Sequence, residues 1–175
     1  MAGSLVTRRN ETTGEKHIAD IRSAHGLVIE FQHSPTDPKE RETREKFYRN
    51  MVWVVDGTRL KRDYPRFLKG KKEFRDTANP EFFLIDYLED IFPSGWLRSS
   101  VPVIFDFKGI ETTNNQSEKH KLYCLFPIRK GMYAILVEIT KRAFIITTIN
   151  GEWSRSVGNF IDDERLHSDS LAARI

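Results

Sequence analysis

The sequence predicts a mixed α/β fold, an α+β arrangement in which one mixed β-sheet is flanked by helices. Three observations predict it. Residues 17–34 alternate in side-chain character like a two-stranded hairpin, residues 38–50 carry the signals of a helix, and residues 51–56 (MVWVVD) read as a buried strand. Strand, helix and strand in this order imply a right-handed crossover, so a parallel strand pair joins the hairpin in one sheet.

The hairpin has the best-specified geometry in the chain, because its turn sets the register. A short first strand is expected ahead of it, over residues 5–9. A three-residue loop ending in glycine favours pairing of Ser23 with Leu27, which places Ile21 opposite Ile29 on an apolar face. This face can cover a hydrophobic core.

The second face of the hairpin carries acidic side chains. The same register puts Asp20 opposite Glu30, and Gln32 shares the face of Glu30 because strand side chains repeat every second residue. Opposed carboxylates repel, and a cation such as Mg²⁺ or Mn²⁺ removes that repulsion because hard cations take oxygen ligands. Two interpretations stay open: a metal site, or two solvated carboxylates on an exposed strand face.

A helix is predicted to follow over residues 38–50. Asp37 can cap its first turn, Pro38 suits the first helical position, and Glu40 follows three residues after the cap. Charged pairs at i,i+4 spacing predict an exposed face. These pairs are Glu40 with Arg44 and Arg41 with Glu45.

The C-terminal half is expected to extend the sheet. Three further strands are predicted: residues 101–107, 122–128 and 132–139. Residues 81–92 and 143–149 are compatible with helix or strand, and the tail from residue 159 could end in a short helix. All 175 residues are assigned to one domain. Its core motifs lie in residues 16–57, with a C-terminal extension at about 100–160.

Basic residues concentrate in residues 59–75, where eight lysines and arginines accompany two acidic residues. We expect this segment to be partly helical and interrupted at Pro65 and Gly70. A basic segment interleaved with aromatic residues is typical of contacts with nucleic-acid phosphates, although such a segment is usually a solvated face. The predicted nucleic-acid contacts are Arg44 and Tyr48 on the preceding helix and Lys61, Arg62, Lys69, Lys71 and Lys72 in this segment.

The composition fits an ordinary globular domain, with 39% hydrophobic and 30% charged residues. Cys124 is the only cysteine, which excludes an internal disulfide and favours a reducing, cytoplasmic setting. No apolar run approaches the length of a membrane-spanning helix, so no membrane is expected as a partner. The oligomeric state stays open, a homodimer included.

The runs HIADI, GLVIEFQHS and REKFYRNMVWVVDG resemble the nuclease segment of competence protein CoiA-like proteins, a branch of the PD-(D/E)XK phosphodiesterase superfamily. The resemblance covers about residues 16–57. It implies a restriction-endonuclease-like core, in which an Asp on one strand and a Glu-x-Lys on the next hold a divalent metal. The implied activity is hydrolysis of DNA phosphodiester bonds by in-line attack of a metal-activated water.

The resemblance also implies roles for individual residues. Asp20 and Glu30 would bind Mg²⁺ or Mn²⁺ together with the main-chain carbonyl of Phe31, and Gln32 would orient the attacking water. Gln32 stands where the superfamily has Lys, and an amide can neither titrate nor supply positive charge. The accessory residues are Lys16, His17, His33 and Ser34, and packing at the sheet is the simpler role for the two histidines.

Two functions therefore compete. A metal-dependent DNA endonuclease is favoured by the carboxylate pair, the basic segment and the resemblance together. A catalytically inactive nucleic-acid-binding or interaction module that keeps the nuclease fold is favoured by Gln32 and by the short stretch ahead of the hairpin.

Overall fold

The computed structural model describes residues 4–9, 16–33, 36–107 and 120–172, with side chains described within residues 20–166 of these ranges. Its strands are β1 (Ser4–Arg9), β2 (Lys16–Arg22), β3 (Val28–Gln32), β4 (Met51–Asp56), β5 (Arg75–Asp76), β6 (Phe82–Ile85), β7 (Val103–Asp106), β8 (Lys121–Lys130) and β9 (Tyr133–Thr140). Its helices are α1 (Pro38–Tyr48), α2 (Asp63–Lys71), α3 (Lys141–Ile149) and α4 (Glu152–Ala172), with 3₁₀ turns η1 (Leu88–Asp90) and η2 (Ser94–Trp96).

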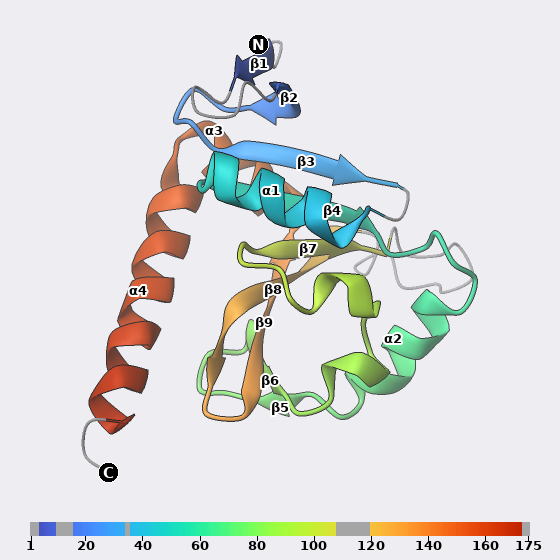
Figure 1. Ribbon diagram of the computed structural model, residues 1–175. Coiled ribbons are helices and arrows are strands. Elements are labelled where there is room, and N and C mark those ends of the chain that lie inside the picture. The colour runs from blue at the N-terminus through green and yellow to red at the C-terminus, as the bar shows by residue number, and fades with distance from the viewer. Residues whose placement is uncertain (1–3, 10–15, 34–35, 108–119, 173–175) are drawn as a thin grey trace.

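One mixed sheet joins the described strands in the order β1-β2-β3-β4-β7-β8-β9-β6-β5. β2 runs antiparallel to β1 and β3, whereas β3, β4 and β7 are parallel. The parallel pair β3–β4 is linked through α1, which lies in front of it in Figure 1. The mixed α/β class and the strand–helix–strand crossover are thus confirmed.

The hairpin register is confirmed beside the turn, for the pairs Ile21–Ile29 and Arg22–Val28. Ile21 pairs with Ile29, and the Ser23 N–H donates to the Leu27 carbonyl at 2.9 Å. Gly26 has φ +83°, a left-handed conformation that a residue with a Cβ rarely adopts. The turn therefore determines which side chains of β2 and β3 share a face.

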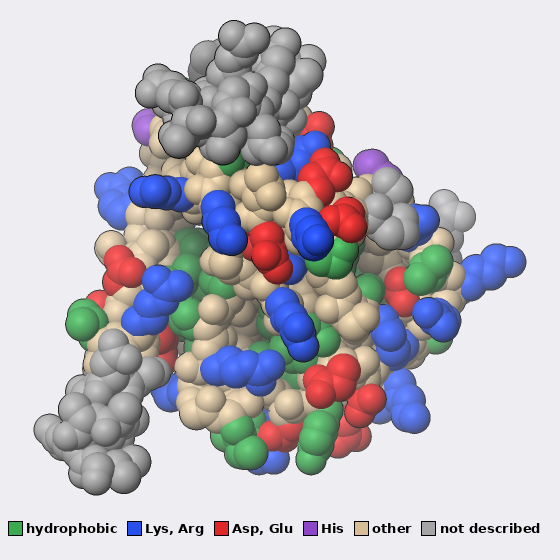
Figure 2. Space-filling view, in the orientation of Figure 1, with side chains coloured by type: hydrophobic (Ala, Val, Ile, Leu, Met, Phe, Trp, Pro, Cys, Tyr) green, Lys and Arg blue, Asp and Glu red, His purple; other side chains and the backbone are tan. Residues whose placement is uncertain are grey.

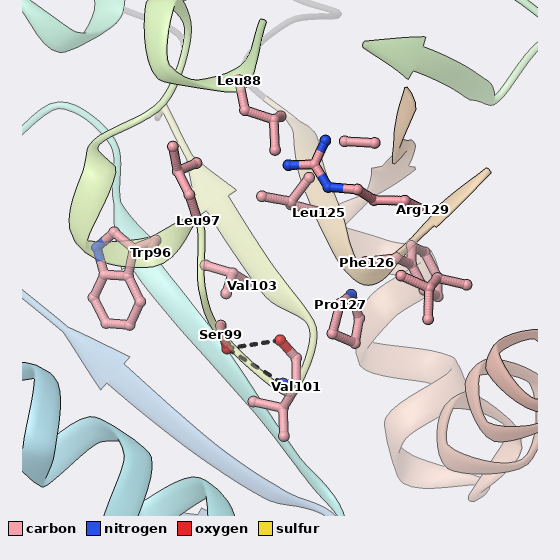
Figure 3. Close-up of a pocket in the computed structure, with 12 residues that line it drawn as sticks. Leu88, Trp96, Leu97, Ser99, Val101, Val103, Leu125, Phe126, Pro127 and Arg129 are labelled. Carbon is pink, nitrogen blue, oxygen red and sulfur yellow. Dashed lines mark hydrogen bonds between the residues drawn. The ribbon is translucent and has the colours of Figure 1, made fainter. Parts of the chain in front are cut away.

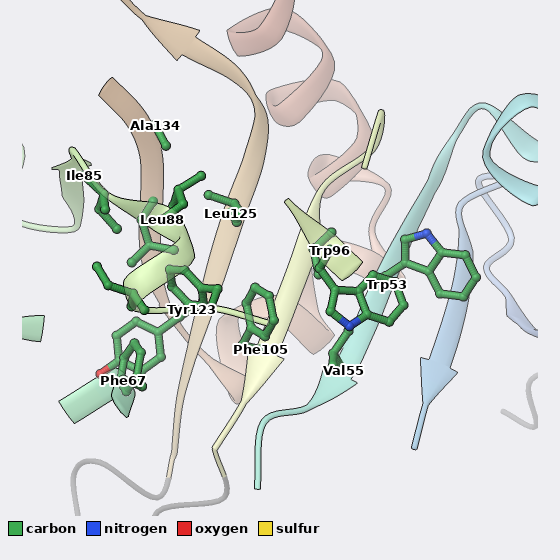
Figure 4. Packing of buried hydrophobic residues seen from close by; sticks show 14 of the residues in the cluster. Trp53, Val55, Phe67, Ile85, Leu88, Trp96, Phe105, Tyr123, Leu125 and Ala134 are labelled. Atoms are coloured by element: carbon green, nitrogen blue, oxygen red, sulfur yellow. The ribbon is translucent and has the colours of Figure 1, made fainter. Parts of the chain in front are cut away.

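The sheet separates two hydrophobic cores, because successive residues of a strand point to opposite faces. On one face the rings of Trp53 of β4 and Trp96 pack with their centroids 5.3 Å apart (Figure 4). Phe67 of α2 stacks on Phe107 on the same face, with ring centroids 4.0 Å apart. On the other face Val52 of β4 joins a cluster that includes residues of α3 and α4. Helices α1 and α2 thus share one side of the sheet, and α3 and α4 cover the other.

Helix α1 begins as predicted, since the Asp37 carboxylate accepts from the Lys39 and Glu40 N–H groups. The expectation that Arg41 and Glu45 form an exposed pair is wrong, because both are 3% exposed. Glu45 is buried because it accepts four hydrogen bonds, from the Trp53 indole, the Ser99 hydroxyl, and the Ser100 N–H and hydroxyl. The donors at Ser99 and Ser100 lie 54 and 55 residues from Glu45 in the sequence, and their hydrogen bonds offset the cost of burying its carboxylate.

Two further predictions need correction, and two open ones are settled. α2 runs through Pro65 and Gly70 without interruption, because the proline lies in the first turn, where its missing N–H costs nothing. The tail forms a long helix, α4, which starts at Glu152. Residues 81–92 supply β6 and η1, and residues 143–149 lie in α3 behind a Thr140 cap.

Within the described part of the chain, no helix is long and apolar enough to cross a membrane.

Candidate functional site

Asp20 lies at an irregularity of β2. Along the β1–β2 pair, Ser4 is opposite Arg22 and Val6 is opposite Ala19, so β2 has one residue more than β1 between these pairs. The extra residue falls at Asp20 or Ile21. A bulge of this kind redirects a side chain, and bulges are common beside active sites.

The Asp20 carboxylate reaches across to β3. Its Oδ2 accepts a hydrogen bond from the Phe31 N–H at 2.7 Å. A regular antiparallel ladder would give this N–H to the carbonyl of residue 19, but the backbone pairs between β2 and β3 stop at Ile21 and Ile29. The side chain of Asp20 therefore replaces a backbone acceptor and is held next to Glu30.

Glu30 is the buried acid of the site, at 3% exposed. Its Oε2 pairs with Arg44 Nη1 at 2.7 Å, while its Oε1 has no hydrogen-bond partner among the described residues. The pKa of Glu30 is raised to about 7, mainly by burial and to a lesser extent by the nearby charge of Asp20, against the opposing effect of Arg44. At neutral pH this carboxyl group is therefore poised between its neutral and ionised forms.

Helix α1 provides the rest of this environment. Arg44 bridges two acids, since its Nη2 also bonds to Glu40 Oε1 at 3.0 Å. Burial raises the pKa of Tyr48, and the charge of Glu30 adds to the effect, so the tyrosine also lies within the electrostatic reach of this carboxylate. Arg44 of the predicted stripe thus contacts Glu30, while Tyr48 packs against the hydrophobic core on the same side of the sheet.

The remaining predicted site residues fall in different places. Gln32 ends β3 on the Glu30 side of the sheet and lines a cavity. His33 is exposed, and its Nδ1 lies 3.5 Å from Asp56 Oδ2. The side chains of Lys16 and His17, and Ser34 entirely, lie outside the described residues, so the structure does not test these predictions.

The predicted basic residues occupy α2 and the turn before it. Figure 2 shows Lys and Arg side chains around this helix, at the right of the view. Lys61, Arg62, Lys69 and Lys72 are exposed. Lys71 differs from them because its ammonium donates to the Tyr123 hydroxyl at 2.6 Å and lies 3.7 Å from Glu138.

A cavity of about 280 Å³ lies at the carboxyl ends of β3 and β4 and was not predicted from the sequence. Its lining includes four arginines and two aspartates, Arg41, Arg59, Arg62, Arg66, Asp56 and Asp63. One feature of the sequence could have indicated this cavity. Asp56 ends an apolar strand directly before a glycine, and ligands of parallel sheets bind outside the carboxyl ends of the strands.

Two other cavities are less suited to chemistry. A cavity of about 80 Å³ is lined mostly by apolar residues, and its Ser99 hydroxyl already bonds to the Val101 carbonyl (Figure 3). A wider hollow of about 900 Å³ lies between α2 and the β6–η1 segment, with Lys69 and Lys72 on its wall. Asp20 and Glu30 line neither of these cavities nor the arginine-lined one.

The two acids fit a hard divalent cation better than a transition metal. Glu30 Oε1 is an unused buried oxygen, Asp20 lies beside it, and Mg²⁺ is commonly held by one or two carboxylates plus water. Within the described ranges, no three His, Cys, Asp or Glu side chains come together as metal ligands. The candidate site thus offers two carboxylates, Asp20 and Glu30.

Comparison with known proteins adds no relative. No family model matches the sequence, and no match is found among curated proteins or solved structures. The resemblance to CoiA-like nucleases therefore stays a prediction from the residues of the hairpin, α1 and β4.

Proposed function

We propose that this protein is a metal-dependent nuclease that hydrolyses DNA phosphodiester bonds, with a restriction-endonuclease-like core around β2, β3, α1 and β4. One observation carries the proposal. The hairpin register and the bulge bring Asp20 beside Glu30, whose free Oε1 and pKa of about 7 suit a group that exchanges a proton for a cation. A mixed sheet with helices on both faces supports it.

Each residue has a role in this proposal. Asp20 and Glu30 would hold Mg²⁺ or Mn²⁺ with the Phe31 carbonyl, and the Gln32 amide would orient the attacking water by hydrogen bonding. The cation, when bound, supplies Lewis acidity. Arg44, which neutralises Glu30 at 2.7 Å in this structure, would turn to a phosphate oxygen of the substrate. The exposed Lys69 of α2 and the flanking Lys61, Arg62 and Lys72 bind the DNA backbone.

The direct test is cleavage of plasmid and oligonucleotide DNA with Mg²⁺ or Mn²⁺. Asp20→Asn and Glu30→Gln should each lower the rate by about 100-fold or more, because each removes a charged ligand. Glu89→Gln, at an exposed acid on η1, is the matched control and should cleave like the wild type. Cleavage that survives both site substitutions, or that persists in chelator, would remove this site from the reaction.

A second candidate is a nucleic-acid-binding module without chemistry. The Arg44–Glu30 ion pair favours it, because Glu30 already has a cationic partner. DNA binding in chelator with no cleavage under any metal would support this function. The double variant Lys69→Gln with Lys72→Gln should then reduce the magnitude of the negative slope of log affinity against log salt by about 2, since each lost phosphate contact removes about 0.9. An unchanged slope would count against contacts at these lysines.

A further inference from the structure

The arginine-lined cavity of about 280 Å³ includes Gln32 in its lining but neither Asp20 nor Glu30, so its arginines need their own explanation. It is formed where β3 and β4 end, with α1 on one side and α2 on the other. Figure 1 shows the carboxyl end of β3 on the same side of the molecule as α2. This is the edge of a parallel sheet at which ligands usually bind.

Arg41 is the unusual residue of this cavity. Its side chain is 4% exposed, yet its Nε and Nη1 donate no hydrogen bond within the described part of the chain. Its nearest acid is Glu45 at 3.6 Å, whose oxygens are already occupied by Trp53, Ser99 and Ser100. A buried guanidinium with unused donors is costly unless a ligand completes its hydrogen bonds.

The charges around Arg41 do not cancel. Asp63 pairs with Arg66 at 3.1 Å, whereas Asp56, which accepts from the Thr58 N–H and hydroxyl, keeps its negative charge and offsets one arginine. Arg59 and Arg62 are exposed on the rim and add two further positive charges. The cavity is therefore positive, and its surplus is carried by arginines, whose planar donors match phosphate oxygens.

We propose that this cavity binds a phosphate monoester, the terminal phosphate of a nucleotide unit, with Arg41 at its base and Arg59 and Arg62 at its rim. Such a group carries a charge of about −1.5 to −2 at neutral pH and three acceptor oxygens. A cavity of about 280 Å³ also leaves room for the attached sugar beside the Trp96 wall. This binding needs neither the metal nor the acids of the hairpin.

Calorimetric titration of the full chain in chelator tests the proposal, because chelator removes metal-dependent cleavage. Inorganic phosphate and deoxyadenosine 5′-monophosphate should bind, whereas deoxyadenosine should not. Arg41→Gln and Arg62→Gln should each weaken binding by about tenfold or more, since each loses charge-assisted hydrogen bonds. Arg155→Gln, at an exposed arginine of α4 on the other face of the sheet, is the matched control. Arg62 is exposed, so its variant keeps the test valid if Arg41→Gln fails to fold.

Oligonucleotides with a 5′-phosphate, a 3′-phosphate or only hydroxyl ends identify the source of the phosphate. Tighter binding of one phosphorylated end assigns the cavity to strand ends, and binding of the mononucleotide alone assigns it to free nucleotides. Equal affinity for deoxyadenosine and its monophosphate, or unchanged affinity in both arginine variants, would overturn the proposal. If the protein cleaves DNA but binds no phosphate monoester, only the proposal for this cavity is wrong. If it binds the monoester but does not cleave DNA with any metal, only the nuclease proposal is wrong.

Discussion

At the scale of single residues, Glu30 shows how burial creates a reactive group. Its carboxylate has an arginine at 2.7 Å, which alone would lower its pKa, yet removal from water outweighs that attraction and brings the pKa to about 7. Asp20, on the neighbouring strand, is instead exposed, and its carboxylate accepts a backbone N–H. Two carboxylates on adjacent strands thus differ in character through their surroundings.

The raised pKa of Glu30 predicts a pH dependence of stability. The pKa is about 7 in the folded state and 4.5 without burial, so folding favours the neutral acid. Its stabilising effect is fully present below pH 4.5 and is lost as the pH rises through 7, by about 3 kcal/mol at most. Urea unfolding from pH 4.5 to 8 should show this decline in the wild type and a flatter profile in Glu30→Gln. If stability falls equally with pH in the wild type and in Glu30→Gln, the pKa of Glu30 is not raised by folding.

Metal binding should release a proton from the same group. A cation favours the ionised carboxylate, so Mn²⁺ binding at pH 7 should expel about half a proton from Glu30. Calorimetry in two buffers of different ionisation enthalpy measures this number. Glu30→Gln should release none, and Asp20→Asn should bind Mn²⁺ more weakly. Equal proton release by wild type and Glu30→Gln would show that another group is titrating.

At the scale of elements, α1 and α2 position both candidate sites through close packing. α1 is anchored by Glu45, which ties it to β4 and to the chain before β7. α2 is anchored by Phe67 and by Gly70, where a Cβ would lie 2.4 Å from Ile91 Cγ1. The glycine that was expected to break this helix instead lets it approach the η1 segment.

A pair of helix glycines tests this role of packing. Gly70→Ala should lower the free energy of unfolding by about 1 to 3 kcal/mol, because the methyl group has no room beside Ile91. Gly158→Ala in α4 should raise it by about 0.5 to 1 kcal/mol, because nothing lies within 4 Å of the added Cβ and alanine favours helix. Urea midpoints of the two variants provide the comparison. A stabilising Gly70→Ala would show that Ile91 moves aside without cost.

At the scale of the whole molecule, one sheet joins two cores. β4, β7 and β8 send alternate side chains into each core, so neither core can form without these strands. Cys124 of β8 lies at the centre of this arrangement at 0% exposed, and burial raises the pKa of its thiol.

Because Cys124 is the only cysteine, its labelling reports on the cooperativity of the whole fold. A thiol reagent should reach it only when the molecule unfolds globally, so the free energy from its labelling rate should equal that from urea unfolding. The comparison needs no substitution. A smaller free energy from labelling would show that β8 opens locally and that the two cores are not one cooperative unit.

The sequence by itself determined the features that depend on neighbouring residues: the hairpin register, the Asp37 cap, the buried strand β4 and the strands β8 and β9. Turn geometry and strand periodicity act within a few positions, so a short segment specifies them. α4 was missed although its apolar spacing at Trp153, Val157 and Phe160 was visible.

Only the tertiary structure decided which charges are buried and which partners they meet. Glu45 meets donors more than 50 residues away, Arg44 meets Glu30 across the crossover, and arginines from α1 and α2 surround one cavity. The physical reason is that burial and the local electric field arise from segments brought together by folding, which spacing along the chain does not encode.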